Sequence, residues 1–311
     1  MVTVLNLFYG AAGVVLLYYG AEFLVKGGVK IARRFKISPL VIGLTLVAFA
    51  TSAPELVVSV DSALKGLGNI SIGNVVGSNI CNIALILGLC AMITPLNVNR
   101  QLFRLDVPLM IVSAVALAVF CIVGHGVNRW QGLLFFAGII AYTLYNIRCA
   151  GKSPEEDSSD GKSDNLLLAA VLVAGGLAAL VGGAKLFVNS AVYIAKLLKV
   201  SDAVIGLTVV AVGTSLPELA TSVVAAVRGE KDIAIGNVVG SNIFNVLAIC
   251  GIAPLVAPIK APGISIVDMS VMMVLSVLLF LMMKTGLSIS RKEGAVLFFS
   301  YCAYTAYLIF A

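Results

Sequence analysis

The sequence predicts an all-α polytopic membrane protein with ten transmembrane helices, arranged as two inverted-topology five-helix repeats. Three observations predict it: an apolar composition, ten long apolar segments, and polar motifs that recur at one fixed separation. Of the 311 residues, 60% are hydrophobic and 12% are charged, whereas soluble domains are about 45–50% apolar and about a quarter charged. So few charges cannot cover a globule in water. A soluble enzyme, a disordered chain and a nucleic-acid-binding protein are excluded, despite the formal net charge of +6.

Ten segments approach or exceed the length of about 20 apolar residues that a helix needs to cross a bilayer. Those of the first half are 3–32, 39–64, 69–95, 106–124 and 129–148. Those of the second half are 166–198, 202–227, 232–257, 264–284 and 291–310. Residues 149–165 (CAGKSPEEDSSDGKSDN) are rich in Ser, Gly and charges, which is typical of a solvated linker. We therefore expect a first five-helix repeat over 1–148, a polar cytoplasmic linker over 149–165 and a second repeat over 166–311.

The basic residues predict the orientation, because cytoplasmic loops are enriched in Lys and Arg. With the N-terminus outside, 15 of the 21 basic residues fall on the cytoplasmic side and six on the outer side. Both termini are therefore expected to be extracytoplasmic. With no organelle address and no long loops, we expect the plasma (inner) membrane of a prokaryote.

Two blocks of sequence recur 163 residues apart without a gap. Residues 38–59 match 201–222 at 14 of 22 positions, and residues 70–83 match 233–246 at 11 of 14. The two motif regions therefore span 38–83 and 201–246. Because each half has an odd number of spans, the second copy enters the membrane from the opposite side, as in many secondary transporters. In a duplicated scaffold without a site, the polar residues of the two copies would be free to differ. Here the matched residues include the polar ones, which favours a binding site.

The matched polar residues include an ionisable one in each repeat. Thr51, Ser52, Pro54 and Glu55 recur as Thr214, Ser215, Pro217 and Glu218. A charged residue at the centre of a membrane helix costs about 2.5–3.5 kcal/mol and marks a functional site by default. Each glutamate follows a proline, which lacks an N–H group and leaves backbone carbonyls available nearby. The carbonyls of Ala50 and Gly213, and of neighbouring Ala48 and Ala211, are therefore candidate ligands.

Helical spacing gathers these side chains on shared faces. Thr51 and Glu55 are four residues apart, as are Ser78 and Asn82. The second repeat has the same spacing for Thr214 and Glu218 and for Ser241 and Asn245. Carboxylate, hydroxyl, amide and carbonyl oxygens are the ligands of a hard cation such as Ca²⁺, which takes 6–8 of them. The glycines of GNVVGSN (Gly73, Gly77, Gly236 and Gly240) would allow the helices to approach closely.

The remaining acidic residues of the apolar segments favour structural interpretations. Asp61, Asp106 and Asp268 lie nearer the ends of spans, where we expect them to be interfacial. Glu22 has Lys185 at the matching position of the second repeat, and we interpret the two as a polar pair at helix ends.

TSAPE with GNVVGSNICN, and TSLPE with GNVVGSNIFN, resemble the two alpha repeats of the calcium/cation antiporter superfamily, most of all its prokaryotic sodium/calcium exchanger family. The resemblance implies ten helices, of which the first and sixth slide across a core of eight, and central cation sites between spans two, three, seven and eight. It implies that Glu55 and Glu218 bind Ca²⁺. Thr51, Ser52, Ser78, Thr214, Ser215 and Ser241, with the carbonyls of Ala48 and Ala211, would complete the Na⁺ and Ca²⁺ shells. Asn82 matches the family pattern, whereas Asn245 departs from it, because exchangers of this type often have aspartate there.

The resemblance implies a secondary active antiporter that exchanges Ca²⁺ for Na⁺ by alternating access, with counter-ions competing for the two glutamates. The expected substrates are Ca²⁺ and Na⁺ in a lipid bilayer, with no cofactor, enzyme activity, nucleic acid or obligate protein partner. Asn245 leaves two glutamates as the central charges, so a Ca²⁺/H⁺ antiporter on the same scaffold stays open. A K⁺-dependent Na⁺/Ca²⁺ exchanger ranks third, since more acidic residues would be expected here.

Two further alternatives belong to other classes. A cation channel also has acidic residues in its pore, but channels usually assemble rings from several subunits. An intramembrane hydrolase could use paired carboxylates as acid and base, but no protease motif accompanies these two.

Overall fold

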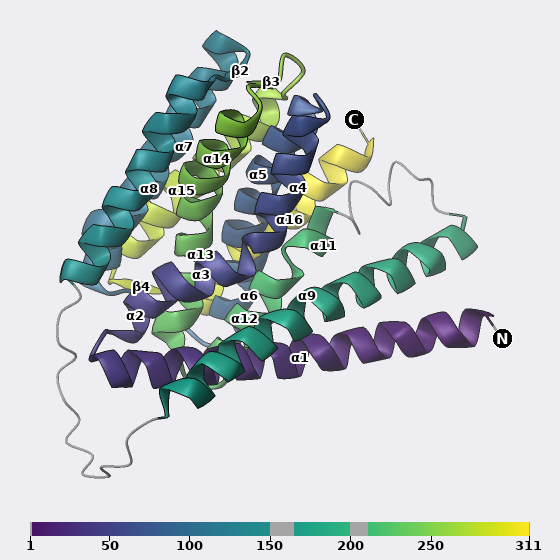
Figure 1. The fold of residues 1–311 in the computed structure, drawn as a ribbon, viewed down its shortest axis with the longest axis vertical. Coiled ribbons are helices and arrows are strands. Elements are labelled where there is room, and N and C mark those ends of the chain that lie inside the picture. Colours follow the sequence, from purple (N-terminus) through teal and green to yellow (C-terminus); the bar gives the residue numbers. More distant parts are fainter. Residues whose placement is uncertain (1, 150–164, 200–210, 311) are drawn as a thin grey trace.

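The computed structural model describes residues 2–149, 165–199 and 211–310. In these ranges the chain is a bundle of long helices with two short pairs of strands (Figure 1). Most of the expected linker, and residues 201–210 of the second motif region, lie outside the described residues. The first motif region can therefore be followed in full, and the second from Ala211 onward.

The five apolar segments of the first half are helical where the sequence predicts them, with ends shifted by a few residues. The helices are α1 (Val2–Phe35), α2 (Pro39–Ile42), α3 (Ala48–Thr51), α4 (Ala53–Leu64), α5 (Gly68–Ile80), α6 (Gly88–Ile93), α7 (Val107–Gly124) and α8 (Arg129–Cys149). Three π-helical stretches interrupt or precede them: η1 (Gly43–Val47), η2 (Cys81–Leu87) and η3 (Leu102–Asp106). Wide turns of this kind are frequent at functional sites.

The second half has the same order of helices and strands wherever it is described, although no counterpart of η3 precedes α15. Its helices are α9 (Leu166–Leu197), α11 (Ala211–Thr214), α12 (Leu216–Val227), α13 (Lys231–Phe244), α14 (Cys250–Val256), α15 (Ile266–Lys284) and α16 (Arg291–Phe310). A π-helical stretch, η5 (Asn245–Ile249), joins α13 to α14. It begins 163 residues after Asn82, close to the start of η2, so the two central helices widen at matching places.

Within the described residues, eight helices are long and apolar enough to cross a membrane, and Pro39–Thr51 with Ala53–Leu64 adds a ninth span bent by 47°. The expected span over 202–227 begins outside the described residues, and its described part is the short apolar helix Leu216–Val227. The bend in the first half lies at Ser52, just before Pro54, because proline removes a helical hydrogen bond and crowds the preceding turn.

Side chains cap several of these helices. Ser38 accepts a hydrogen bond of 3.3 Å from the N–H of Val41, and Pro39 occupies the first position of α2, where no N–H is needed. Asn165 accepts from the N–H of Leu167 at 3.0 Å and so starts α9 directly after the linker. Local chemistry thus sets the start of both helices.

Two short antiparallel strand pairs connect loops of the two halves. Strand β1 (Leu96–Asn97) pairs with β4 (Ser288–Ile289), and β2 (Gly126–Val127) pairs with β3 (Ile259–Lys260). Figure 1 places β2 and β3 at the opposite end of the bundle from β4. Gly126 has φ +148°, and a Cβ there would lie 2.0 Å from the carbonyl oxygen of Ile259, so only glycine permits this pairing. Each end of the bundle is therefore closed by one segment from each half.

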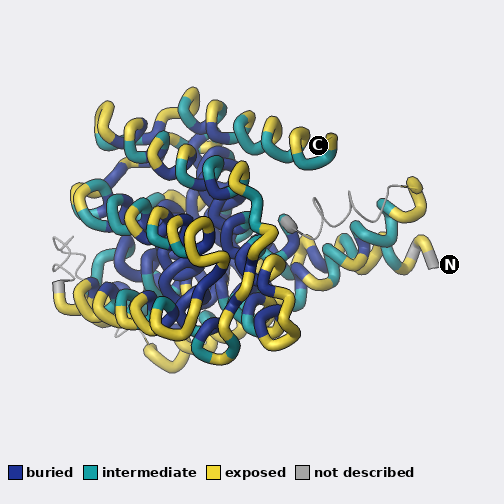
Figure 2. The backbone as a smooth tube through the Cα atoms, turned by 90° about the horizontal axis from the view of Figure 1, so that it is seen from above, coloured by how far each residue is buried: buried dark blue, intermediate teal, exposed yellow. Residues whose placement is uncertain are grey.

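The long helices α1 and α9 lie side by side and project beyond the rest of the bundle at the N-terminal end of α1 (Figures 1 and 2). Their backbones touch at glycines. A Cβ on Gly13 would lie 2.8 Å from the carbonyl oxygen of Gly183, and one on Gly20 would lie 2.9 Å from that of Gly176. Small residues at such crossings allow membrane helices to pack closely without polar side chains.

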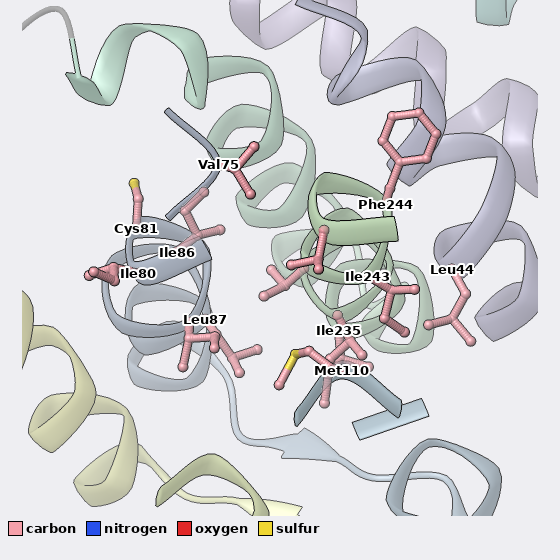
Figure 3. Packing of buried hydrophobic residues seen from close by; sticks show 14 of the residues in the cluster. Leu44, Val75, Ile80, Cys81, Ile86, Leu87, Met110, Ile235, Ile243 and Phe244 are labelled. Carbon is pink, nitrogen blue, oxygen red and sulfur yellow. The ribbon is translucent and has the colours of Figure 1, made fainter. Parts of the chain in front are cut away.

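The two GNVVGSN segments lie at the centre of the molecule. The most apolar stretch of Lys231–Val256 is 89% buried and that of Gly68–Ile93 is 72% buried, against 11% for Arg291–Phe310. Figure 2 shows the same gradient, with buried backbone inside and exposed backbone on the outer helices. Apolar side chains from several elements, among them Val75 of α5, Ile235 of α13 and Met110 of α7, form the surrounding core (Figure 3). The polar residues of the motif are thus surrounded by hydrocarbon.

Candidate functional site

Both glutamates lie in the first turn of a helix that starts at a break. Glu55 is in the first turn of α4, which begins after Ser52, and Glu218 is in the first turn of α12, which begins after Ser215. The two serines have almost the same backbone, with φ −85° and ψ 5° for Ser52 and φ −88° and ψ 9° for Ser215. The free N–H groups and the dipole of a helix N-terminus favour negative charge there. The prolines therefore place each carboxyl group at the N-terminus of a helix inside the bundle.

Each glutamate accepts a hydrogen bond from the serine of the opposite half. Ser52 Oγ donates to Glu218 Oε1 at 2.8 Å, and Ser215 Oγ donates to Glu55 Oε1 at 3.3 Å. All four residues are fully buried. The two broken helices therefore meet at their breaks, and the two carboxyl groups belong to one site.

Two asparagines that the sequence analysis did not single out hold the breaks against the central helices. Asn74 Nδ2 donates to Ser59 Oγ at 3.0 Å and to the carbonyl oxygen of Glu55 at 3.3 Å. Asn237, its equivalent in the second half, makes the same two hydrogen bonds, to Ser222 Oγ at 2.9 Å and to the carbonyl oxygen of Glu218 at 3.5 Å. Their identity in both copies of GNVVGSN is the signal that could have identified them.

Thr51 and Ala48 already have partners within the described residues. Thr51 Oγ1 lies 3.1 Å from Val47 O and 3.1 Å from Asn237 Oδ1, within reach to donate to either. The carbonyl oxygen of Ala48 accepts from the N–H of Ser52 at 3.0 Å. These oxygens would have to share their lone pairs with a cation. Ala211 begins α11, and the residues before it are outside the described ranges, so its carbonyl stays a prediction.

Many of the other predicted ligands present buried polar atoms without a hydrogen-bond partner among the described residues. These atoms are Glu55 Oε2, Glu218 Oε2, Ser78 Oγ, Ser241 Oγ, Asn82 Oδ1, Asn245 Oδ1 and Thr214 Oγ1. Buried polar groups are almost always satisfied, because each one left unpaired costs free energy. Six of these oxygens occupy matching positions of the two repeats, whereas the counterpart of Thr214, Thr51, has partners. Oxygens of these types are the ligands of a hard cation, and two carboxylates balance one divalent charge.

Four buried amides link the central helices across the two halves. Asn245 Nδ2 donates to Asn79 Oδ1 at 3.0 Å, and Asn82 Nδ2 donates to Asn242 Oδ1 at 3.4 Å. Asn82 and Asn245 occupy equivalent positions of the two repeats, and so do Asn79 and Asn242. The two hydrogen bonds therefore join the same two repeat positions, with the halves exchanged. Asn79 and Asn242 were not among the predicted ligands, although both lie in the matched motif.

A family model described as sodium/calcium exchanger protein matches residues 5–148 and 168–310, which leaves only the linker region and the chain ends unmatched. The chain belongs to this sodium/calcium exchanger family. As a member, it is a multi-pass membrane transporter, and its relatives support cation antiport as its activity in place of catalysis.

Relatives in the exchanger family match along nearly the whole chain. A putative antiporter, CaxA of Alkalimonas amylolytica, is 36% identical over 96% of this chain and 97% of its own. The sodium/calcium exchanger MaX1 of Methanosarcina acetivorans is 34% identical over the full length of both chains. The solved structure of the sodium-calcium exchanger NCX_Mj soaked with Na⁺ and Sr²⁺ is 35% identical, covers 98% of each chain and superposes with a TM-score of 0.86.

The structure changes the interpretation of two peripheral acidic residues. Asp106 is fully buried within the bundle, where its Oδ1 accepts a hydrogen bond of 2.9 Å from the hydroxyl of Tyr142. Glu22 does not pair with Lys185, which is exposed. Its Oε1 instead lies 2.7 Å from Lys26 Nζ and 2.6 Å from Arg228 Nη2, joining α1 to the end of α12.

The other two aspartates lie closer to the surface. Asp61 is exposed and pairs with Lys65 at 2.6 Å. Asp268 is half-buried, and its Oδ1 accepts from the hydroxyl of Tyr304 at 2.9 Å. The pairs Tyr142–Asp106 and Tyr304–Asp268 are separated by the same 36 residues and occupy matching places in the two halves.

Proposed function

We propose that this chain is a secondary active antiporter that exchanges Ca²⁺ for Na⁺ across the plasma membrane by alternating access. The observation that carries the proposal is the reciprocal pair of hydrogen bonds, Ser52 to Glu218 and Ser215 to Glu55. It joins two buried carboxyl groups from opposite halves, each with one oxygen lacking a partner among the described residues. Oxygen ligands with two negative charges suit Ca²⁺, and the same charges can be balanced by two Na⁺.

The mechanism follows from the shared ligands. Ca²⁺ and its counter-ions compete for Glu55 and Glu218, so the site holds one substrate or the other. An empty site leaves two buried carboxylates uncompensated, which is costly in a low-dielectric interior. Conformational exchange is therefore favoured only when cations fill the site. This requirement couples the outward movement of Ca²⁺ to the inward movement of the counter-ion.

We further propose that the chain consists of two inverted repeats, 1–148 and 166–311, joined by a cytoplasmic linker over 149–165, with both termini extracytoplasmic. Reciprocal contacts at equivalent positions support this arrangement. Three sets of contacts are reciprocal: a position in the first half contacts a second position in the other half, and the equivalent contact has the halves swapped. They are the hydrogen bonds of the four amides, the glycine contacts between α1 and α9, and the two strand pairs. Such exchange is what a two-fold axis in the membrane plane produces. The paired helices α1 and α9 would then be the elements that slide against the remaining eight spans.

Ca²⁺/H⁺ antiport is the second candidate, and Asn245 favours it. With an amide at this position, the carboxyl groups of the described site are those of Glu55 and Glu218. Two protons would neutralise them as well as two Na⁺ would. A K⁺-dependent exchanger is a third possibility, with less support because it would call for more acidic ligands.

Uptake of radioactive Ca²⁺ into proteoliposomes tests the proposal. Vesicles loaded with Na⁺ are compared with acid-loaded, Na⁺-free vesicles, using the wild-type protein, Glu55→Gln and Glu218→Gln. Asp61→Asn is the matched control, because it neutralises an exposed acidic residue on the same helix as Glu55. We expect uptake driven by the Na⁺ gradient, lost in both glutamate variants and retained in Asp61→Asn. Uptake driven only by the proton gradient would establish the second candidate, and no gradient-driven uptake by folded protein would refute both.

A further inference from the structure

The four buried amides at the centre differ in what they offer a cation. An asparagine side chain has an oxygen that can bind a cation and an NH₂ group that cannot. Asn82 and Asn245 use their Nδ2 atoms in hydrogen bonds, and their Oδ1 atoms have no partner among the described residues. Both amides are thus held with the nitrogen engaged and the oxygen left for a ligand.

The groups that hold them are Asn242 and Asn79, each from the opposite half. Asn79 Oδ1 accepts from Asn245 at 3.0 Å, and Asn242 Oδ1 accepts from Asn82 at 3.4 Å. Asn79 is itself fixed, because its Nδ2 donates to the carbonyl oxygen of Asn242 at 3.4 Å and contacts Met272 Sδ at 3.8 Å. Its acceptor oxygen is therefore oriented toward Asn245, whereas Asn242 has no such anchor, because its Nδ2 has no partner among the described residues.

We propose that Asn79 is a positioning residue that turns the amide oxygen of Asn245 toward the cation site, and that Asn242 does the same for Asn82. The inference rests on the proposed function, because it assigns these residues to the same central site. An aspartate at position 245 would present an oxygen in either orientation, since its two oxygens are chemically equal. The amide of this chain needs an acceptor behind it, and Asn79 supplies that acceptor.

A double-mutant cycle on the full-length protein tests the inference through the apparent Ca²⁺ affinity for Na⁺-driven uptake. We expect Asn79→Ala to weaken this affinity about tenfold when residue 245 is asparagine, because the free amide can turn its NH₂ group inward. In the Asn245→Asp background, the same change should alter affinity less than about twofold. An equal loss in both backgrounds, or no loss in the first, would overturn the inference.

Two controls separate positioning from folding. Asn146→Ala removes a fully buried amide from α8, distant in the chain from the site, where it donates to the carbonyl oxygen of Tyr142 at 3.1 Å. We expect it to change thermal stability but not the apparent Ca²⁺ affinity. If Asn79→Ala does not fold, the equivalent cycle of Asn242→Ala with Asn82→Asp carries the test. Failure of the wild-type protein to transport Ca²⁺ would refute the proposed function, and with it this inference. If the wild-type protein transports Ca²⁺ but Asn79→Ala has the same effect on apparent Ca²⁺ affinity in both backgrounds, only the positioning role is refuted.

Discussion

Ser52 Oγ donates a hydrogen bond of 2.8 Å to Oε1 of Glu218, a residue 166 positions away in the chain. The bond crosses between the breaks of two helices that come from opposite halves of the molecule. Its equivalent, from Ser215 to Glu55, measures 3.3 Å. Each carboxyl group is therefore oriented by the half to which it does not belong, so a movement of one half changes the ligands offered by both.

The unequal lengths of these two bonds predict unequal effects of removing them. Ser52→Ala should weaken the apparent Ca²⁺ affinity about two- to tenfold, because Glu218 then loses the donor that holds its rotamer, and ordering a side chain costs about 0.5–1.5 kcal/mol. Ser215→Ala should have the smaller effect. Titration of Ca²⁺ uptake measures both. Ser113→Ala, which removes a buried hydroxyl bonded to Met110 O on α7, is the control and should leave affinity unchanged. A larger loss in Ser215→Ala would contradict the assignment.

Substrate binding should also be visible as thermal stabilisation. A ligand at about 100 times its dissociation constant stabilises the folded state by about 2.7 kcal/mol, so Ca²⁺ should raise the unfolding temperature of the detergent-solubilised protein. Glu55→Gln and Glu218→Gln should each lower affinity by at least about a hundredfold, because losing one of two buried charges costs several kcal/mol. The Ca²⁺-dependent rise in unfolding temperature should then disappear in both variants. Differential scanning fluorimetry measures this temperature with and without Ca²⁺. Persistence of the rise in either variant would place the Ca²⁺ site elsewhere.

The centre of the site was predictable because its residues are repeated. Glu55 and Glu218 stand out as charges in apolar segments, and the fixed separation of 163 residues identifies their neighbours. Proline before each glutamate also predicts the break at Ser52 and at Ser215. Asn79 and Asn242 share the same repetition, but nothing in a linear spacing shows that they hold other asparagines from behind.

The contacts that were not predictable join residues far apart in the chain. Glu22 pairs with Arg228 across 206 residues, whereas matching positions in the repeat suggested Lys185. Asp106 lies near the start of a span, which indicated an interface, yet Tyr142 from the next helix covers it. Burial of this kind depends on how neighbouring helices cross, and helix crossing is set by packing of whole surfaces, with no signature in a single segment.

The two tyrosine–aspartate pairs predict a difference in stability between equivalent substitutions. Tyr142→Phe should destabilise the protein by about 1–3 kcal/mol, because Asp106 is fully buried and its Oδ2 already has no partner among the described residues. Tyr304→Phe should cost about 0.5–1.5 kcal/mol, since half-buried Asp268 can exchange its lost partner for water. Denaturation in detergent measures both. Equal losses in the free energy of unfolding would mean that burial does not determine how much each Tyr–Asp hydrogen bond contributes to stability.

Pairs of adjacent glycines in α9 predict which face of this helix must lack side chains so that α1 can pack against it. A Cβ on Gly176 would lie 2.7 Å from Gly20 O, and one on Gly183 would lie 2.9 Å from Gly13 O, closer than real contacts allow. Gly176→Ala and Gly183→Ala should therefore force α1 and α9 apart, at a cost of about 1–3 kcal/mol.

Their neighbours are matched controls, because a Cβ on Gly175 or Gly182 meets no atom of the described residues within 4 Å. Gly175→Ala and Gly182→Ala should retain wild-type stability and Ca²⁺ uptake. If α1 and α9 slide as one pair, the two clashing variants should lose transport rate more than Ca²⁺ affinity, because their substitutions lie outside the ion site. Initial rates measured over a range of Ca²⁺ concentrations separate the two effects. If the two variants instead lost Ca²⁺ affinity at an unchanged maximal rate, this result would contradict the prediction that α1 and α9 move as one pair during transport.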